Sequence, residues 1–366
     1  MNPSSSSFLF LLVIFLVYSI SASAIPVIGD NDVDEGFDPS KKLEGDKDNN
    51  NEFTLKVPTL ELDDLPLDDL LSFNYYHKRC PDFEAIINRK VHEWINKDYT
   101  LAPSLLRLHF HDCFGRGCDA SILLNHEGSE RTAAASKTLR GFEVIDDIKA
   151  ELENKCPKTV SCTDILSATT RDATVALGGP YWSLPYGRKD SRISIAKDAD
   201  ELVPMGHENV TSLLEFFQSK GLNVLDLVVL SGAHTIGRTS CESIQYRLYN
   251  YKGTGKPDSS IDAKYLNFLQ RKCRWGSDYV DLDATTPRKF DNMYYKNLEK
   301  KMGLLSTDQL LYSDPRTSPI VGALADTPSV FKSQFGVSMA RLADVQILSG
   351  KGEGEIRTNC NYVNSY

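Results

Sequence analysis

Within fifteen residues, from Arg107 to Ser121, the chain gathers a guanidinium, two histidines, two aspartates and a serine around two glycines and two cysteines. Arg107 and His111 are four residues apart, so on a helix both side chains point from one face into the same space. An imidazole can move a proton, and a neighbouring guanidinium can stabilise negative charge on a departing oxygen. This pair is therefore suited to breaking an O–O bond.

The residues after His111 favour a hard cation. Asp112, Asp119 and Ser121 follow in a loop that contains glycine, and such oxygen donors suit Ca²⁺ rather than zinc. Zinc at His109 and His111 is disfavoured, because side chains two positions apart on a helix do not face each other. Taken alone, the segment also fits an ordinary core helix with a solvated Arg/His pair.

Three later segments carry residues that could complete a site. Residues 226–238 form an apolar run that ends at His234, and residues 281–292 are rich in carboxylates and hydroxyls. Residues 304–310 place Asp308 after an apolar turn. Each segment is weak evidence alone, since a buried histidine at a helix end is more often hydrogen-bonded in a core.

Helices must position these residues. Apolar side chains recur at helical spacing in 144–152, 213–217, 265–269 and 331–342, with Gly- and Pro-containing breakers between the stripes. Alternation with period two is scarce, and no internal repeat is present. The sequence therefore predicts a mainly α fold with long irregular loops.

Charge and composition narrow the class of protein. The chain has 366 residues, 41% hydrophobic and 25% charged, with a net charge of −9. Residues 25–70 hold 14 acidic residues and 4 lysines, a net charge of −10, while residues 1–24 carry none, so the remainder is close to neutral. No basic face stands out, and we expect no nucleic-acid partner.

The N-terminal region predicts secretion. Residues 8–18 are apolar and precede Ala22-Ser23-Ala24, so residues 1–24 are predicted to be a signal peptide. Residues 25–70 have the composition of a disordered acidic extension. No later run is apolar enough to span a bilayer, and we expect no membrane contact in the mature form. The even count of eight cysteines then indicates disulfides, but the count alone does not determine which cysteines are paired.

In their order and spacing, these motifs resemble those of the secreted plant haem peroxidases (class III), over about residues 71–364. The resemblance implies a haem-peroxidase fold with helices around one buried haem b and with two Ca²⁺ ions per chain. It also implies four disulfides, which pair Cys80 with Cys156, Cys113 with Cys118, Cys162 with Cys360, and Cys241 with Cys273.

The resemblance assigns roles around the haem. His234 matches the axial ligand and Asp308 the carboxylate that accepts its other ring proton. His111 matches the distal base, Arg107 the distal cation and Phe110 a wall of the distal pocket.

One distal position departs from the family. An Asn usually holds the inner N–H of the distal histidine, but Ser136 occupies that position and the segment before Arg140 looks one residue short. Because serine reaches less far, we expect Ser136 to hold His111 through water or more loosely and to slow peroxide activation.

Both calcium sites follow from the same resemblance. The distal site is expected to use the side chains of Asp112, Asp119 and Ser121, the carbonyls of Asp112, Gly115 and Gly117, and Glu130 through water. The proximal site is expected to use Thr235, Asp283, Thr286, Asp291 and the carbonyl of Lys289.

Three further features carry expectations. Asp164 and Arg188 match a buried ion pair of the family. Pro204 occupies the position whose carbonyl contacts aromatic donors, although its motif is degraded here. Asn209 begins the one N-glycosylation sequon of the sequence, Asn209-Val-Thr211.

We therefore expect a secreted, monomeric haem peroxidase that uses H₂O₂ and small phenolic donors, in the cell wall or, alternatively, the vacuole. The first alternative is a wall-associated haem protein of the same fold with weakened catalysis and a binding or structural role. The second is a calcium-dependent, disulfide-rich adhesive module without haem.

Overall fold

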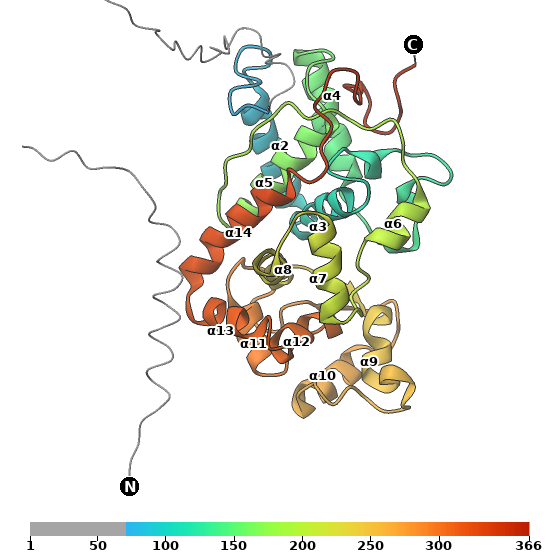
Figure 1. The fold of residues 1–366 in the computed structure, drawn as a ribbon, viewed down its shortest axis with the longest axis vertical. Helices are drawn as coiled ribbons and strands as arrows, with labels where there is room; N and C mark the ends of the chain where they lie inside the picture. Colours follow the sequence, from blue (N-terminus) through green and yellow to red (C-terminus); the bar gives the residue numbers. More distant parts are fainter. Residues whose placement is uncertain (1–70, 366) are drawn as a thin grey trace, which may run out of the picture. The chain divides into compact units, whose positions relative to one another are not determined.

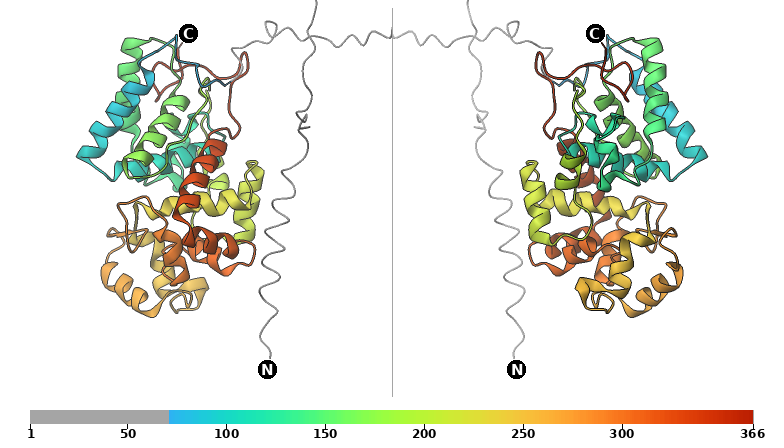
Figure 2. Two further views of the ribbon diagram at one scale, coloured as in Figure 1. Left: turned by 90° about the vertical axis from the view of Figure 1, so that its left-hand side faces the viewer. Right: turned by 90° about the vertical axis from the view of Figure 1, so that its right-hand side faces the viewer.

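The computed structural model describes residues 71–365, which are predominantly helical (Figures 1 and 2). Apart from isolated bridges, strand in this part of the chain is limited to β1 (Arg238–Ser240) and β2 (Tyr279–Asp281). The prediction of a mainly α fold is confirmed. The signal peptide predicted at 1–24 and the acidic extension predicted at 25–70 lie outside the described residues.

Four helices from the first half of the chain pack together, and one of them contacts the other three. They are α2 (Phe83–Lys97), α3 (Leu101–Phe114), α4 (Phe142–Lys155) and α5 (Cys162–Ala176). Helix α5 contacts the other three, and its many alanines, serines and threonines let them approach closely. Its N-terminus is stabilised by Ser161, whose hydroxyl accepts a 3.1 Å hydrogen bond from the amide of Asp164.

Short 3₁₀ turns occupy the connection between α3 and α4. They are η3 (Ser121–Leu123), η4 (Glu130–Thr132) and η5 (Ala134–Ser136). Helix α6 (Ala196–Leu202) packs on η4 and η5. This connection therefore holds three of the residues predicted for the distal side, Ser121, Glu130 and Ser136.

The second half of the chain forms another helical group, in which α8 lies between α7 and α14 (Figure 1). A capping box at Asn223 and Asp226 starts α8, which is otherwise largely apolar and continues into η6. The elements of this group are α7 (Val210–Ser219), α8 (Val224–Ser231), η6 (Gly232–Thr235), α11 (Met293–Glu299), α12 (Ser306–Ser313), α13 (Ser318–Asp326) and α14 (Pro328–Leu342).

A smaller apolar core, separate from the main one, lies among residues 241–305. The sheet belongs to this region, with Arg238 opposite Asp281 in antiparallel register. Its helical elements are η7 (Cys241–Ile244), α9 (Gln245–Tyr249), η8 (Tyr251–Gly253) and α10 (Ala263–Lys272).

Four disulfides join all eight cysteines, in the pairs that the resemblance implied. Cys162–Cys360 spans 198 residues and ties the C-terminal segment to the start of α5. Cys241–Cys273 closes the smaller core. Each cross-link restricts the unfolded chain and so favours the folded state.

Asp164 and Arg188 form an ion pair at 3.0 Å, and both side chains are completely buried. Asp164 also accepts hydrogen bonds from the Tyr76 hydroxyl and from the amide of Gly187, each 2.8 Å long. These donors offset part of the cost of burying the charge. Within residues 71–365, no helix has the length and apolar character that a membrane span requires.

Candidate active site

Arg107 lies on helix α3. Its guanidinium donates to the Thr138 hydroxyl at 2.8 Å and to the Ala135 carbonyl at 3.1 Å. Burial without a carboxylate partner lowers the pKa of Arg107 to about 10, so the group is still a cation at neutral pH. The two hydrogen bonds fix the guanidinium against the η5 segment.

His111 lies one helical turn further along α3 and is almost completely buried. Burial, and then the charge of Arg107, hold the pKa of its imidazole well below the usual value. The ring is therefore neutral at physiological pH and able to accept a proton. Its Nδ1 has no hydrogen-bond partner among the described residues.

Ser136 is buried at the end of η5, but its hydroxyl makes no direct hydrogen bond with His111 or any other described residue. Two buried polar atoms on the distal side thus lack a protein partner. Phe110, half-buried, is beside them, with its ring centre 6.0 Å from that of His111 and stacked on Phe114 at 4.3 Å.

His234 and Asp308 form the second half of the arrangement. The Nδ1 atom of His234, in η6, lies 2.8 Å from Oδ1 of Asp308, near the start of α12. The same carboxylate accepts from the Tyr294 hydroxyl at 3.0 Å and from the Leu305 amide at 3.0 Å. Burial lowers the pKa of His234, but the charge and hydrogen bond of Asp308 outweigh it, so the pKa is raised overall.

Both halves of the arrangement keep accessible surface. The side chain of His234 keeps 35% of its surface accessible, and Arg107 is also exposed, although burial shifts the pKa of each. Arg107 also lowers the pKa values of both His234 and His111, so all three side chains lie within electrostatic reach.

These residues fit a haem group. Because Nδ1 of His234 is hydrogen-bonded to Asp308, the other ring nitrogen, Nε2, is the one that could bind iron. A neutral His111 and the cationic Arg107 lie one turn apart on α3.

The distal acidic cluster lies behind α3. Asp112, Asp119, Ser121 and Glu130 are all buried, and the Ser121 hydroxyl and both carboxylate oxygens of Glu130 lack hydrogen-bond partners in the described chain. Burial, followed by repulsion from Asp119 and Glu130, raises the pKa of Asp112 well above its usual range. Burial also raises the pKa of Glu130 to about 8. Such a cluster needs protons or a cation, and its oxygen donors fit Ca²⁺.

Two glycines lie where this loop packs closely, Gly115 against Glu130 and Gly117 against Gln346. A Cβ on Gly115 would lie 3.1 Å from Oε2 of Glu130. At Gly117, φ is +125° and a Cβ would lie 2.5 Å from the carbonyl oxygen of Gln346, so a side chain there is excluded. The Gly115 carbonyl, expected to be a calcium ligand, accepts a 2.8 Å hydrogen bond from Nζ of Lys220.

A second set of oxygen donors meets beside η6. The Thr235 hydroxyl lies 3.2 Å from Oδ2 of Asp283, and the Thr286 hydroxyl lies 2.9 Å from Oδ1 of Asp291. Thr286 also reaches Asp283 at 3.4 Å, while the Lys289 ammonium is 3.7 Å from Asp291. The hydroxyls and carboxylates predicted for the proximal site are thus neighbours, and they fit Ca²⁺.

One further group of ligand-type side chains does not form a metal site. Within residues 71–365, one group of three His, Cys or acidic ligand atoms lies within 4.8 Å, namely His109, Cys113 and Cys118. The two cysteines form a disulfide, so no thiolate can bind a metal there.

The remaining predicted residues lie near the end of α6 and the start of α7. Pro204 is half-buried in the connection between them. Asn209 is the exposed N-cap of α7, and its side-chain oxygen accepts a 3.0 Å hydrogen bond from the amide of Ser212.

Sequence reasoning missed three contacts. Thr138 anchors Arg107, Tyr294 donates to Asp308, and Lys220 caps the Gly115 carbonyl. These pairs are 31, 14 and 105 residues apart, and no local pattern marks them.

Comparisons with known proteins agree with this geometry. Residues 87–327 match the family model described as peroxidase. The chain is 61% identical over 302 residues to Peroxidase 7 of Arabidopsis thaliana, covering 82% of this chain and 86% of that protein. It is 43% identical to Peroxidase 1 over 303 residues (81% and 93%) and 41% identical to Peroxidase 28 over 300 residues (80% and 93%), both from the same plant. With this coverage, the chain belongs to the class III plant peroxidase family.

Proposed function

We propose that this protein is a haem-dependent peroxidase that reduces one H₂O₂ to two waters while two phenolic donors each lose one electron and one proton. The observation that carries the proposal is the pairing of His234 with Asp308 within electrostatic reach of Arg107, whose charge also acts on His111. The depressed pKa of His111 keeps its imidazole neutral and Arg107 remains a cation, as their proposed roles require.

Haem b would be held through Nε2 of His234, with one haem per chain. When bound, the haem would supply the two electrons that reduce peroxide and would regain them from the two donors. Asp308 keeps the Nδ1 proton of His234 in a strong hydrogen bond, which gives the ring imidazolate character and raises its electron donation. Tyr294 and the Leu305 amide hold that carboxylate in place.

His111 acts as the general base. Because its pKa is depressed, its Nε2 takes the proton from one peroxide oxygen and delivers it to the other, which departs as water. The Arg107 guanidinium stabilises negative charge on the departing oxygen. Thr138 and the Ala135 carbonyl keep it oriented for this task.

Ser136 supports His111 through a bridging water in our proposal. Both the serine hydroxyl and Nδ1 of His111 are buried without a protein partner, and buried polar atoms rarely stay unsatisfied. Phe110 walls the pocket and keeps donors from the peroxide site.

We further propose two calcium ions per chain, one at each cluster of oxygen donors. The distal ion would neutralise the buried carboxylates behind α3, with Glu130 in contact through water. Since Asp112 adjoins His111 and Thr235 adjoins His234, each ion would brace one histidine of the active site.

The proposed setting is the extracellular cell wall or, alternatively, the vacuole, with the chain acting as a monomer and Asn209 carrying a glycan. Phenolic donors would approach near Pro204.

The test is the visible spectrum of the calcium-loaded protein before and after one equivalent of H₂O₂. We expect a Soret band that weakens with peroxide and recovers when a phenol is added. A Soret band that ignores peroxide would refute the distal assignment, and no Soret band at all would refute the haem assignment.

A further inference from the structure

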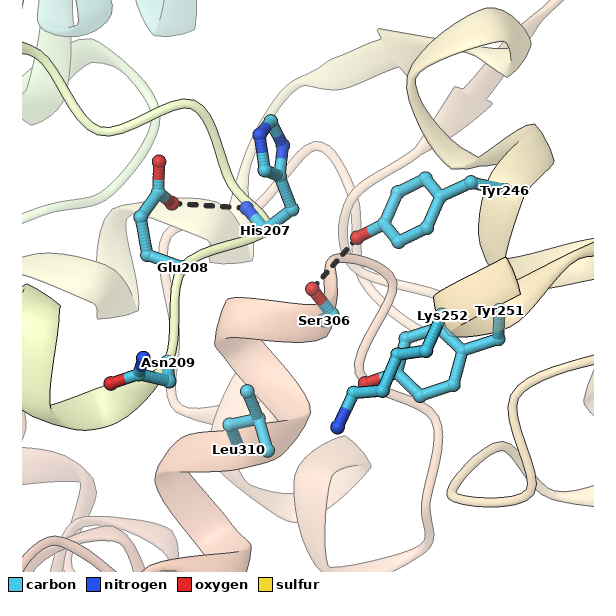
Figure 3. Close-up of a pocket in the computed structure, with 8 residues that line it drawn as sticks. All are labelled: His207, Glu208, Asn209, Tyr246, Tyr251, Lys252, Ser306 and Leu310. Atoms are coloured by element: carbon cyan, nitrogen blue, oxygen red, sulfur yellow. Dashed lines mark hydrogen bonds between the residues drawn. The ribbon is translucent and has the colours of Figure 1, made fainter. Parts of the chain in front are cut away.

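An open pocket of about 370 Å³ lies where three segments distant in sequence meet (Figure 3). The connection before α7 contributes His207, the α9–η8 segment contributes Tyr246, Tyr251 and Lys252, and α12 contributes Ser306 and Leu310. This volume is in the range of small-molecule sites. Asn209 also lines the pocket, so the inference concerns the chain without a glycan there; the other side chains have no part in the proposed peroxidase mechanism.

Flat and apolar surfaces form the walls. The rings of Tyr246 and Tyr251 are stacked at 6.1 Å with an angle of 29° between their planes, and the His207 ring meets Tyr246 edge-on at 6.2 Å. A 2.7 Å hydrogen bond between the Tyr246 and Ser306 hydroxyls fixes the first ring (Figure 3). These walls suit a planar aromatic ring, which gains from stacked or edge-on contact.

Lys252 places an ammonium at the pocket. It lies 5.2 Å from the centre of the Tyr251 ring, and within residues 71–365 Lys252 forms no salt bridge. Glu208 also lines the pocket, but its carboxylate accepts hydrogen bonds from the amides of its own loop, at 2.6 Å from Met205, 2.9 Å from Gly206 and 3.0 Å from His207. The acid is thus satisfied locally, whereas the lysine is not.

The backbone holds Lys252 in an unusual conformation. Its φ of 52° and ψ of 30° are left-handed, as is the φ of Lys158 and of Lys301. The turn is closed by hydrogen bonds from the Tyr251 amide to the Lys256 carbonyl at 2.9 Å and from the Thr254 amide to the Tyr251 carbonyl at 3.1 Å. This turn places the end of the Lys252 side chain in the pocket (Figure 3).

We propose that this pocket binds a planar aromatic carboxylate. The ring would lie against Tyr246, Tyr251 and Leu310, and the carboxylate would pair with the Lys252 ammonium. A neutral alcohol with the same ring would lose the ion pair and bind less tightly. The inference goes beyond the proposed function, because it adds a site that selects anions and does not require peroxide or haem chemistry.

Equilibrium dialysis of the full-length, peroxide-free protein against cinnamate and cinnamyl alcohol tests the proposal. Neither probe carries a phenolic hydroxyl, so neither is a peroxidase donor. We expect Lys252→Met to weaken cinnamate binding about three- to fivefold and to leave the alcohol unchanged. Lys252→Arg should keep most of the affinity. The matched control is Lys256→Met, which removes an exposed lysine of the same turn that does not line the pocket.

Equal affinity of the unmodified protein for the acid and the alcohol would overturn the proposal. So would an equal loss in the Lys252→Met and Lys256→Met variants, since general surface charge would then explain binding. Rising salt should weaken cinnamate binding alone. A protein that binds cinnamate through Lys252 but shows no Soret band would disprove the proposed function and leave this inference standing.

Discussion

Replacing Ser136 with asparagine should accelerate the reaction with peroxide. The Ser136 hydroxyl and Nδ1 of His111 are both buried and do not reach each other. Asparagine carries a carboxamide in place of the hydroxyl and reaches further, so its carbonyl can accept a hydrogen bond from the Nδ1–H group of His111 directly. A direct bond holds Nε2 neutral and aimed at the peroxide, which is the state that the base requires.

The size of the effect follows from one hydrogen bond. A net contribution of about 0.5–1.5 kcal/mol, expressed fully in the transition state, corresponds to a rate increase of about two- to twelvefold. We expect this increase in the second-order rate constant for peroxide, measured by stopped-flow absorbance at the Soret band. Ser136→Ala removes the anchor for a bridging water and should lower the same constant.

Two results would contradict this reasoning. If Ser136→Asn and Ser136→Ala both react at the original rate, the side chain at this position does not orient His111. If Ser136→Asn is slower while its thermal midpoint is unchanged, the longer side chain disturbs the base instead of holding it.

Three further predictions concern the proximal side, calcium and the core. Asp308→Asn should slow the peroxide reaction about 10- to 100-fold by stopped flow, because His234 loses its carboxylate partner; an unchanged rate would contradict this role. Burial raises the pKa of Glu130 from 4.5 to about 8. The stabilisation from its proton is therefore full below pH 4.5 and lost as pH rises toward 8, so the melting temperature in chelator should fall over that range and calcium should restore it. Arg188→Met should cost about 3–5 kcal/mol in urea unfolding, because Asp164 is left as a buried unpaired charge; a smaller loss would mean that Tyr76 and Gly187 compensate.

Much of the fold and one half of the site follow from local patterns. Arg107 and His111 are joined by helical spacing alone, and the apolar stripes predict most of the helices that carry them. Motif order then indicated the family, and with it the disulfide pairs that arithmetic could not choose. These inferences succeed because the relevant interactions act within a helix or recur across a family.

The sequence by itself determined the class of fold, the chemistry of the active-site residues and the departure at Ser136. Only the tertiary structure decided that Thr138 anchors Arg107 across 31 residues, that Tyr294 donates to Asp308, and that Lys252 points into an aromatic pocket. Side-chain spacing along a chain specifies contacts over one or two helical turns. Contacts between distant segments depend on how the helices pack, and no local pattern records that packing.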